Sequence, residues 1–294
     1  MLQEQLCRPV QIITPRRYVL DGLWFGGQRP KIGIVFVHGL TGTAFGLHKL
    51  LTPLATKNIA VLYFSNRGHD KVTGIKKIDK KSKKGYRWEL AGEAHERFTD
   101  CPDDLQGAMD LLRKSGAKKI YLVGHSTGSQ KVAYYLAQGD NQKRIAGAAL
   151  LSPLSDYADA KKFTPPAKLA KAERFAKKLV AQKKPHELLP LTIWPDLLDA
   201  QRFLSLYTPN SEEEIFSYAQ PEKPPRMMRK IKIPLLVVLA GKDEFRDRDI
   251  KEIADWFESN LASESPSIIT VQNASHGFKK KENIITDLVR DFMR

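Results

Sequence analysis

The sequence predicts an α/β protein with a mostly parallel central sheet flanked by helices, and three observations indicate this class. Short apolar runs alternate with stretches of helical periodicity, which is the pattern of successive βα units. The runs at 32–37 and 59–64 are apolar throughout, as expected for strands buried on both faces of a sheet. A third run, at 120–123, leads directly into a Gly-x-Ser-x-Gly segment and a helical stretch. The 294 residues, 42% of them hydrophobic, suffice for one globular domain with an insertion and exclude a wholly disordered or collagen-like chain.

The first half of the chain supplies most of the predicted sheet. Two strands joined at Pro15-Arg16 are expected to form an antiparallel hairpin at the entry to the domain. Further along, Pro102 suits the first turn of a helix and Gly116 suits the position just after its end. The strands expected in this half are residues 9–14, 17–25, 32–37, 59–64, 120–123 and 145–151, and the helices are residues 46–57, 102–115 and a segment from Gly128 to near Gly139.

The alternation stops after Ser152, where the composition shifts to Pro, Lys and aromatic residues. Thr164-Pro165-Pro166 is typical of a helix N-cap and first turn, and the apolar residues behind it fall on one helical face. We therefore expect residues 152–230 to form a helical cap, inserted into a core made of residues 1–151 and 231–294. The last elements expected in this core are strands at 233–239 and 268–271 and helices at 250–257 and 284–293.

The net charge of +15 comes almost entirely from two segments. Residues 71–87 contain eight basic residues and one acidic one, and residues 160–187 contain nine basic and two acidic ones, so each carries +7. The first is expected to be the loop after strand 59–64, and the second belongs to the expected cap. Both are expected to wall the entrance to the site, where they would attract anionic substrates. A second interpretation is that a helix at 167–184 makes peripheral contact with an anionic membrane. The simplest interpretation is that the lysines form a solvated surface without a partner. Nucleic acid is disfavoured as a partner, because residues 75–85 contain no aromatic residue to stack on bases.

Other features of the sequence indicate the cellular compartment and argue against metal chemistry. Cys7 and Cys101 are too few for a disulfide framework or a cysteine metal site, and Cys101 is expected to be buried and inert. Glu93, His95 and Glu96 lack zinc-motif spacing, so a solvated or locally paired cluster is expected there, with no metal and no cofactor. The sequence has no run typical of a signal peptide or a membrane span, which favours a cytoplasmic protein.

The segment Gly124-His125-Ser126-Thr127-Gly128 carries the predicted chemistry. A strand that turns sharply into a helix forces the central serine into a strained backbone conformation, and the flanking glycines permit the close approach this needs. The hydroxyl of Ser126 is then presented above the sheet, near the positive end of the following helix. A surface serine in an ordinary βα turn is the alternative, which the flanking strand and helix disfavour.

A serine nucleophile needs a base, and the base needs a carboxylate that orients it. In an elbow of this type, the acid and then the base follow the serine along the chain. Of the two later histidines, His186 lies in the expected cap, whereas His276 follows the last strand and is the better base. Asp243, just after the preceding strand, is the expected acid, and Asp156 is the alternative.

The loop after strand 32–37 is expected to complete the site. Acyl transfer needs N–H donors for the developing oxyanion, and we expect them to be the backbone amides of Leu40 and Thr127. His38 and Gly39 belong to the same loop, with His38 ordering it and Gly39 allowing close approach. His125 is expected to pack beside the nucleophile. His38, Gly39 and His125 are therefore the predicted substrate-binding residues.

Taken together, five segments resemble those of serine hydrolases with the α/β-hydrolase fold, over roughly residues 30–292. These are His38-Gly39, Asn66-Arg67-Gly68-His69, the serine segment 124–128, Gly241-Lys242-Asp243 and Ser275-His276-Gly277. The serine segment and Asn-Arg-Gly-His also resemble the branch that includes the fungal siderophore-ester hydrolases. Thr127 departs mildly from many relatives, which carry Met, Leu or Gln there.

The expected function is hydrolysis of a small carboxylic ester, including anionic or lipid-like esters, through an acyl intermediate on Ser126. The same residues would serve a thioesterase, an amidase or peptidase, or an acyltransferase. A non-catalytic binding protein that keeps this fold is the alternative of another class. The intact order of Ser126, Asp243 and His276 argues against that alternative.

Overall fold

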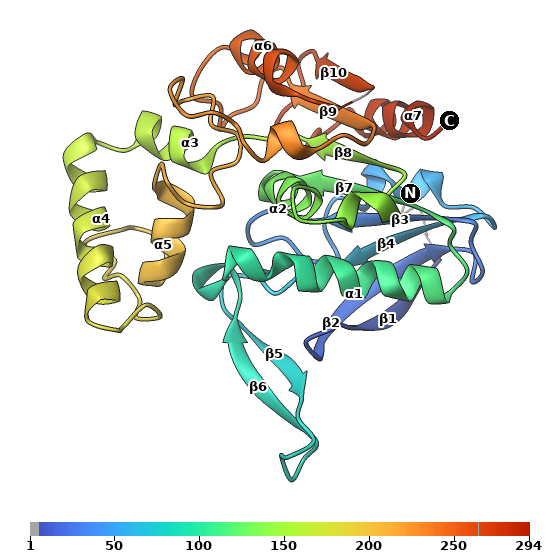
Figure 1. Cartoon of the computed structure of the whole chain (residues 1–294), viewed down its shortest axis with the longest axis horizontal. Coiled ribbons are helices and arrows are strands. Elements are labelled where there is room, and N and C mark those ends of the chain that lie inside the picture. The colour runs from blue at the N-terminus through green and yellow to red at the C-terminus, as the bar shows by residue number, and fades with distance from the viewer. Residues whose placement is uncertain (1–5, 264) are drawn as a thin grey trace.

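The computed structural model describes residues 6–263 and 265–294. Within them, the architecture is a ten-stranded mixed sheet flanked by helices (Figure 1). The order across the sheet is β10-β9-β8-β7-β3-β4-β2-β5-β6, with β1 paired to β2. The strands are β1 (Cys7–Ile13), β2 (Tyr18–Gly26), β3 (Ile32–Val37), β4 (Ile59–Phe64), β5 (Thr73–Ile78), β6 (Tyr86–Ala91), β7 (Lys119–His125), β8 (Gly147–Leu151), β9 (Leu235–Ala240) and β10 (Pro266–Val271).

The six strands from β10 to β4 are mutually parallel, and β1, β2, β5 and β6 are antiparallel to their neighbours. The α/β class and the mostly parallel sheet are therefore confirmed. Because the parallel strands share one direction, the loops that follow β3, β7, β8, β9 and β10 meet at one edge of the sheet. In open α/β sheets this edge is where ligands bind.

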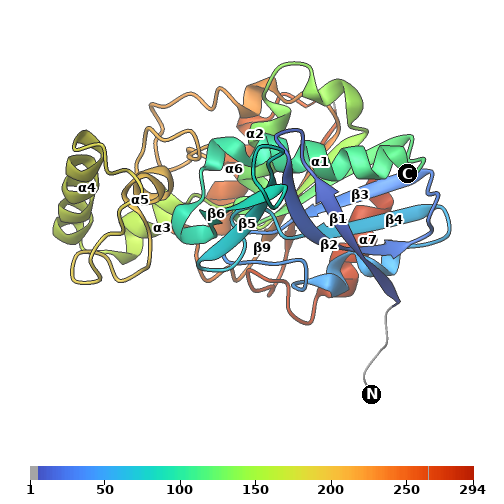
Figure 2. The same cartoon turned by 90° about the horizontal axis from the view of Figure 1, so that it is seen from below.

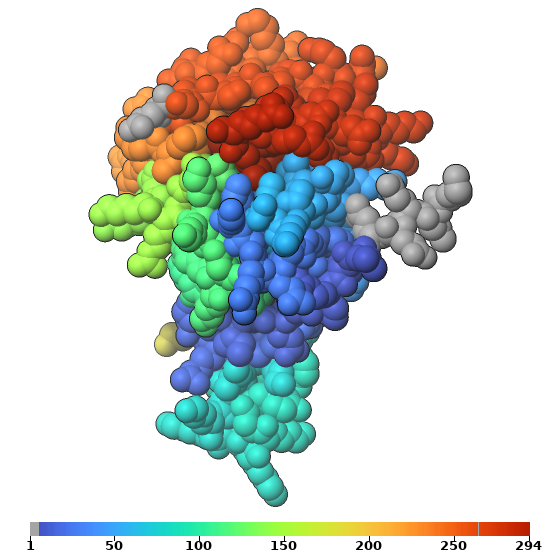
Figure 3. Space-filling model, turned by 90° about the vertical axis from the view of Figure 1, so that its right-hand side faces the viewer, coloured from blue at the N-terminus to red at the C-terminus, as the bar shows by residue number. Residues whose placement is uncertain are grey.

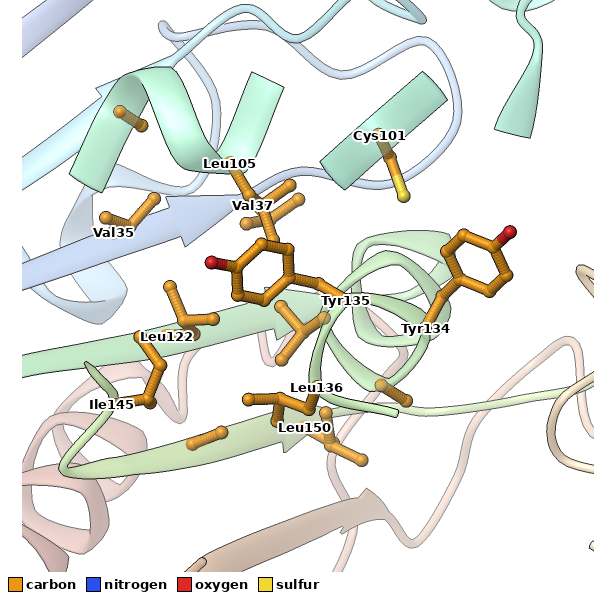
Figure 4. Close-up of a cluster of buried hydrophobic side chains, with 14 of the residues drawn as sticks. Val35, Val37, Cys101, Leu105, Leu122, Tyr134, Tyr135, Leu136, Ile145 and Leu150 are labelled. Carbon is orange, nitrogen blue, oxygen red and sulfur yellow. The ribbon is translucent and has the colours of Figure 1, made fainter. Parts of the chain in front are cut away.

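Helices cover both faces of the sheet. In β3, Val35 and Val37 face a core shared with α1, α2 and α6, whereas Ile34 and Phe36 face a second core shared with α7. Figure 4 shows part of the first core, where Tyr135 packs among aliphatic side chains of the strands. The helices are α1 (Cys101–Lys114), α2 (Thr127–Leu136), α3 (Asp156–Phe163), α4 (Pro166–Ala181), α5 (Ala200–Tyr207), α6 (Ile250–Asn260) and α7 (Glu282–Phe292).

Helices α3, α4 and α5 stand beyond one end of the sheet, as Figures 1 and 2 both show. The apolar face of α4 packs against Trp194 and Phe203 in a core of its own. In contrast, Ile215, Phe216 and Met228 belong to the main core. The last part of segment 152–230 therefore packs on the sheet domain, and the division into core and cap stays a proposal.

Three local expectations were wrong. Residues 46–57 form two short 3₁₀ helices, His48–Leu50 and Thr52–Leu54, since Pro53 cannot donate a backbone hydrogen bond within a longer helix. Thr164 ends α3 and does not cap α4; it precedes a proline and is extended, at φ −111°. The lysine-rich segment is no loop, because β5 and β6 form a hairpin that extends the sheet.

Candidate active site

Ser126 lies between β7 and α2 with a backbone conformation that non-glycine residues rarely adopt, at φ 56° and ψ −131°. Two glycines make this turn possible. A Cβ added to Gly124 would lie 2.4 Å from the carbonyl oxygen of Gly128, and one added to Gly128 would lie 2.0 Å from that of Val37. The strand, turn and helix pack too closely for any side chain at these two positions. Strain of this kind is typical of functional sites.

His276 and Asp243 are paired at the same edge of the sheet. Nδ1 of His276 lies 2.8 Å from Oδ2 of Asp243, and Asp243 is only 3% exposed. The other carboxylate oxygen of Asp243 accepts a hydrogen bond from the backbone N–H of Phe245 at 3.1 Å. Asp243 therefore holds Nδ1 of His276, and Nε2 takes no part in this pair.

The backbone of His276 is held as firmly as its ring. Its carbonyl oxygen accepts hydrogen bonds from Nε2 of His125 at 2.9 Å and from the Ser152 hydroxyl at 2.8 Å. Its N–H donates to Glu244 at 2.9 Å. Glu244 therefore ties the loop after β9 to the backbone of His276. Ser152 was missed, although its position directly after β8 could have indicated it.

His125 is a buried neutral histidine that packs against His276, with their ring centroids 4.9 Å apart. Burial, and then the neighbouring His276, lowers the pKa of His125 to about 3. A carbonyl oxygen can only accept, so Nε2 of His125 carries the hydrogen.

The loop after β3 lies directly against the nucleophile. A Cβ added to Gly39 would lie 2.7 Å from Cβ of Ser126 and 3.1 Å from its Oγ. The backbone amide of Leu40 has no acceptor among the residues that the structure describes. Thr127 begins α2, and the first amides of a helix have no intrahelical acceptor. Both amides are thus available to a ligand.

His38 fixes this loop from behind. Its Nε2 accepts a hydrogen bond from the backbone N–H of Asn66 at 3.0 Å, so its Nδ1 carries the hydrogen and donates to the carbonyl oxygen of Gly39 at 2.8 Å. Burial, and then the nearby Lys131, lowers the pKa of His38 to about 3. His38 therefore orders the loop, with both of its ring nitrogens engaged by backbone groups.

A chain of buried charges continues from Asn66 into α5. Lys131, fully buried in α2, donates to Oδ1 of Asn66 at 3.2 Å and lies 2.5 Å from Oε1 of Glu96. The other oxygen of Glu96 lies 2.9 Å from the guanidinium of Arg202, which is fully buried in α5 and also pairs with Glu213. Although burial opposes it, Lys131 and Arg202 hold the pKa of Glu96 at about 2.

Glu93, His95 and Glu96 were expected to be solvated or locally paired, and the structure agrees with pairing. Each of the three has a charged partner within 3.0 Å. Glu93 and Glu96 are buried, with Glu93 2.7 Å from Nζ of Lys71. His95 and His186 each place Nδ1 3.0 Å from the same oxygen of Asp199. The described residues contain no cluster of three His, Cys, Asp or Glu that could hold a metal ion.

The serine turn, the loop after β3 and His276 line one cavity of about 440 Å³. Ser126 and His276 both line it, although no hydrogen bond joins their side chains among the described residues; such contacts often tighten only when substrate binds. Its wall includes Asp156 and Asp159 of α3. The lining residues are Phe36, His38, Gly39, Leu40, Thr41, Gly42, Thr43, Gly46, Leu47, His125, Ser126, Leu154, Ser155, Asp156, Asp159, Tyr207, Phe245 and His276.

The cavity does not share the positive charge of the chain. No lysine or arginine lines it, so the expectation that the two basic segments wall the site is wrong for the cavity itself. Burial, followed by the nearby Asp243, raises the pKa of Asp159 to about 6. Burial also raises the pKa of Asp156, which accepts a hydrogen bond from Gln130 and has no contact with His276. Asp156 is therefore not the orienting acid in this arrangement.

Cys101 is buried and Cys7 is exposed, and both are free thiols. Burial raises the pKa of the Cys101 thiol well above its ordinary value, so it has little thiolate character.

No described helix is both long and apolar enough to cross a membrane.

The sheet and the strained serine between β7 and α2 are those of the α/β-hydrolase fold. The chain belongs to the DUF1749 family of proteins of unknown function, whose model matches residues 99–293. A second family, described as an alpha/beta hydrolase of unknown function (DUF915), matches residues 27–152. Among curated proteins, none matches the sequence.

Solved structures of esterases and lipases are similar over nearly the whole chain. The siderophore hydrolase EstB from Aspergillus fumigatus is 18% identical, with a TM-score of 0.68 over 99% of this chain and 98% of that one. The monoacylglycerol lipase of Paleococcus ferrophilus is 19% identical, with a TM-score of 0.62 over 93% and 98%. Naproxen esterase from Bacillus subtilis is 16% identical, with a TM-score of 0.57 over 99% and 92%. At these identities the likeness shows the fold alone.

Proposed function

We propose that this protein is a serine hydrolase that cleaves a carboxylic ester through an acyl intermediate on Ser126. The observation that carries the proposal is the 2.8 Å contact between His276 and Asp243 beside a cavity that both His276 and the strained Ser126 line. Orientation of the imidazole by a buried carboxylate is what a general base needs in order to activate a serine hydroxyl.

The reaction assigns one role to each group. Ser126 Oγ attacks the ester carbonyl while Nε2 of His276 takes its proton, and Asp243 stabilises the imidazolium that forms. The amides of Leu40 and Thr127 donate to the oxyanion of the tetrahedral intermediate. His276 then gives the proton to the leaving alcohol. In the second half of the reaction, His276 takes a proton from water, which attacks the acyl group, and returns the proton to Ser126 Oγ as the acid leaves.

The cavity favours a small, uncharged or amine-bearing ester. Its volume of about 440 Å³ lies within the usual range for small-molecule sites. Its wall is largely apolar, with the carboxyl groups of Asp156 and Asp159 and without lysine or arginine. A carboxylate or phosphate on the substrate would find no lysine or arginine to pair with there, so we do not retain the anionic substrate predicted from the net charge.

Steady-state hydrolysis of p-nitrophenyl butyrate tests the proposal. We expect turnover by the wild type and a loss in kcat on the order of 10⁶ in Ser126→Ala. Ser129→Ala is the matched control, because Ser129 lies in the first turn of α2, three residues after Ser126, and its hydroxyl donates to the carbonyl oxygens of Gly124 and Leu151. Activity that persists in Ser126→Ala would refute the proposal. A matched series of ester, thioester and amide then identifies the bond that is cleaved fastest.

A further inference from the structure

The hairpin of β5 and β6 projects away from the body of the molecule, as Figures 1 and 3 show. It contains most of the first basic segment and ends the sheet, with β6 as the edge strand. The proposed catalysis makes no use of it. One face of the hairpin is anchored to the rest of the protein, whereas the other exposes large apolar side chains.

The inner face of the hairpin is anchored to the body. Ile75 and Ala91 are buried in the main core. Nζ of Lys77 donates to the hydroxyl of Tyr18 in β2 at 3.1 Å, and the same hydroxyl donates to Glu89. These contacts hold the hairpin in a defined position on the sheet.

The outer face is apolar and uncovered. In the antiparallel register Tyr86 lies opposite Ile78, and Trp88 lies opposite Lys76, so these side chains share one face with Leu90. Trp88 is 64% exposed and Leu90 is 63% exposed. Nζ of Lys76 lies 4.5 Å from the centre of the Tyr86 ring. The face is therefore a stripe of apolar and aromatic groups flanked by a cation.

The turn beyond this stripe is strongly basic. Lys80, Lys81, Lys83 and Lys84 are all exposed, and Asp79 is the one acidic residue beside them. None of the four lysines has an ion-pair partner among the described residues. Unpaired ammonium groups on a projecting turn create a local positive field that salt would screen.

The stripe is continuous with the region of the candidate site. Trp88, Lys76 and the exposed Phe45 line a groove of about 580 Å³ between the hairpin and the loop after β3. Thr43 lines both this groove and the catalytic cavity. A surface that contacts the hairpin and Phe45 would therefore lie next to the entrance of the cavity.

We propose that this hairpin docks the protein on an anionic phospholipid bilayer. Trp88, Tyr86 and Leu90 would enter the interfacial region, where aromatic side chains are favoured, while the turn lysines bind the headgroups. Stable peripheral attachment needs two such signals, and the hairpin supplies both. Protection of the edge strand would explain lysines alone, but not a large apolar face left exposed beside them. This inference does not depend on the proposed catalysis.

Flotation with vesicles tests it, using phosphatidylcholine alone and phosphatidylcholine mixed with phosphatidylserine, at low and at high salt. We expect binding to the anionic vesicles only, weakened by salt. Each lysine near such a surface contributes roughly fivefold to the partition coefficient. Replacing Lys80, Lys81, Lys83 and Lys84 by Gln should therefore weaken binding by a factor of about 600. Trp88→Ser with Leu90→Ser should abolish it at moderate salt.

The matched control removes the same charge from α4 and the turn after it. Lys168, Lys171, Lys178 and Lys183 are exposed and have no ion pair among the described residues. Their replacement by Gln should leave vesicle binding unchanged, and circular dichroism should report folded protein for every variant. Absence of binding by the wild type, or loss in this control but not in the hairpin variants, would overturn the proposal. So would binding of a single-stranded oligonucleotide through the hairpin without binding of vesicles.

Discussion

The carboxylate of Asp243 and the imidazole of His276 meet at 2.8 Å, although they follow different strands of the sheet. The meeting depends on the parallel pairing of β9 and β10, which brings the loops after both strands to one edge. Because Oδ1 of Asp243 is held by the backbone N–H of Phe245, its Oδ2 is directed at the ring. The geometry thus specifies one tautomer of His276, with the hydrogen on Nδ1.

Asp243→Asn should lower kcat for ester hydrolysis by about 10⁴, because an amide at this position favours the wrong tautomer of the base. The change is nearly isosteric, so thermal unfolding should shift little by comparison. Asp140→Asn is the control, since Asp140 is an exposed partner of Lys143 far from the cavity. A kcat for Asp243→Asn within a few-fold of wild type would remove Asp243 from the mechanism.

Gly39→Ala should reduce kcat by about 10²–10³, the loss typical of one oxyanion donor. The added methyl would lie 2.7 Å from Cβ of Ser126, which forces the loop away from the nucleophile. Gly46 offers a matched comparison in the same cavity wall, because a Cβ there would find its nearest neighbour at 3.8 Å. Gly46→Ala should retain activity within a few-fold. Equal effects of the two substitutions would contradict the close-approach argument.

Glu96→Gln should lower the free energy of unfolding by about 3–5 kcal/mol, since it leaves the buried charges of Lys131 and Arg202 without their common partner. Urea unfolding measures this. Asp255→Asn breaks the exposed pair with Lys251 and should cause no measurable change. If Glu96→Gln unfolds like the wild type, the network contributes little to the stability of the fold.

Asp159→Asn should stabilise the protein at neutral pH but not in acid. The folded-state pKa of Asp159, about 6, lies above its ordinary value of 3.8, so the folded state binds the proton more tightly than the unfolded state does. Its contribution to stability is then complete below about pH 4 and is lost as the pH rises through 6. Unfolding of both proteins between pH 4 and pH 8 should show a difference that grows up to about pH 6 and then levels off. A difference independent of pH would contradict the assignment.

Sequence reasoning located the strands with the clearest burial. The ranges 32–37 and 59–64 agree to the residue with β3 and β4, because both strands are apolar on both faces. Ser126, Asp243 and His276 could be selected because their order in the chain and their positions after strands limit the alternatives. Their roles remain a proposal until they are tested.

Other features of the structure were not predicted from the sequence. The hairpin of β5 and β6 was read as a loop because its lysines dominate the composition, although the alternation of Tyr86, Trp88 and Leu90 could have indicated a strand. The burial of Lys131 and Arg202 depends on partners from distant segments. Residue type argues against burial of either side chain, so only the assembled fold reveals it.

The most direct test of the central claim is labelling with a fluorophosphonate, read by intact mass. An activated Ser126 predicts a single adduct on the wild type, the same adduct on Ser129→Ala, and none on Ser126→Ala. This probe needs no knowledge of the natural substrate, because it reacts with the activated hydroxyl itself. Folded wild-type protein that gains no adduct, or equal labelling of Ser126→Ala, would contradict the account.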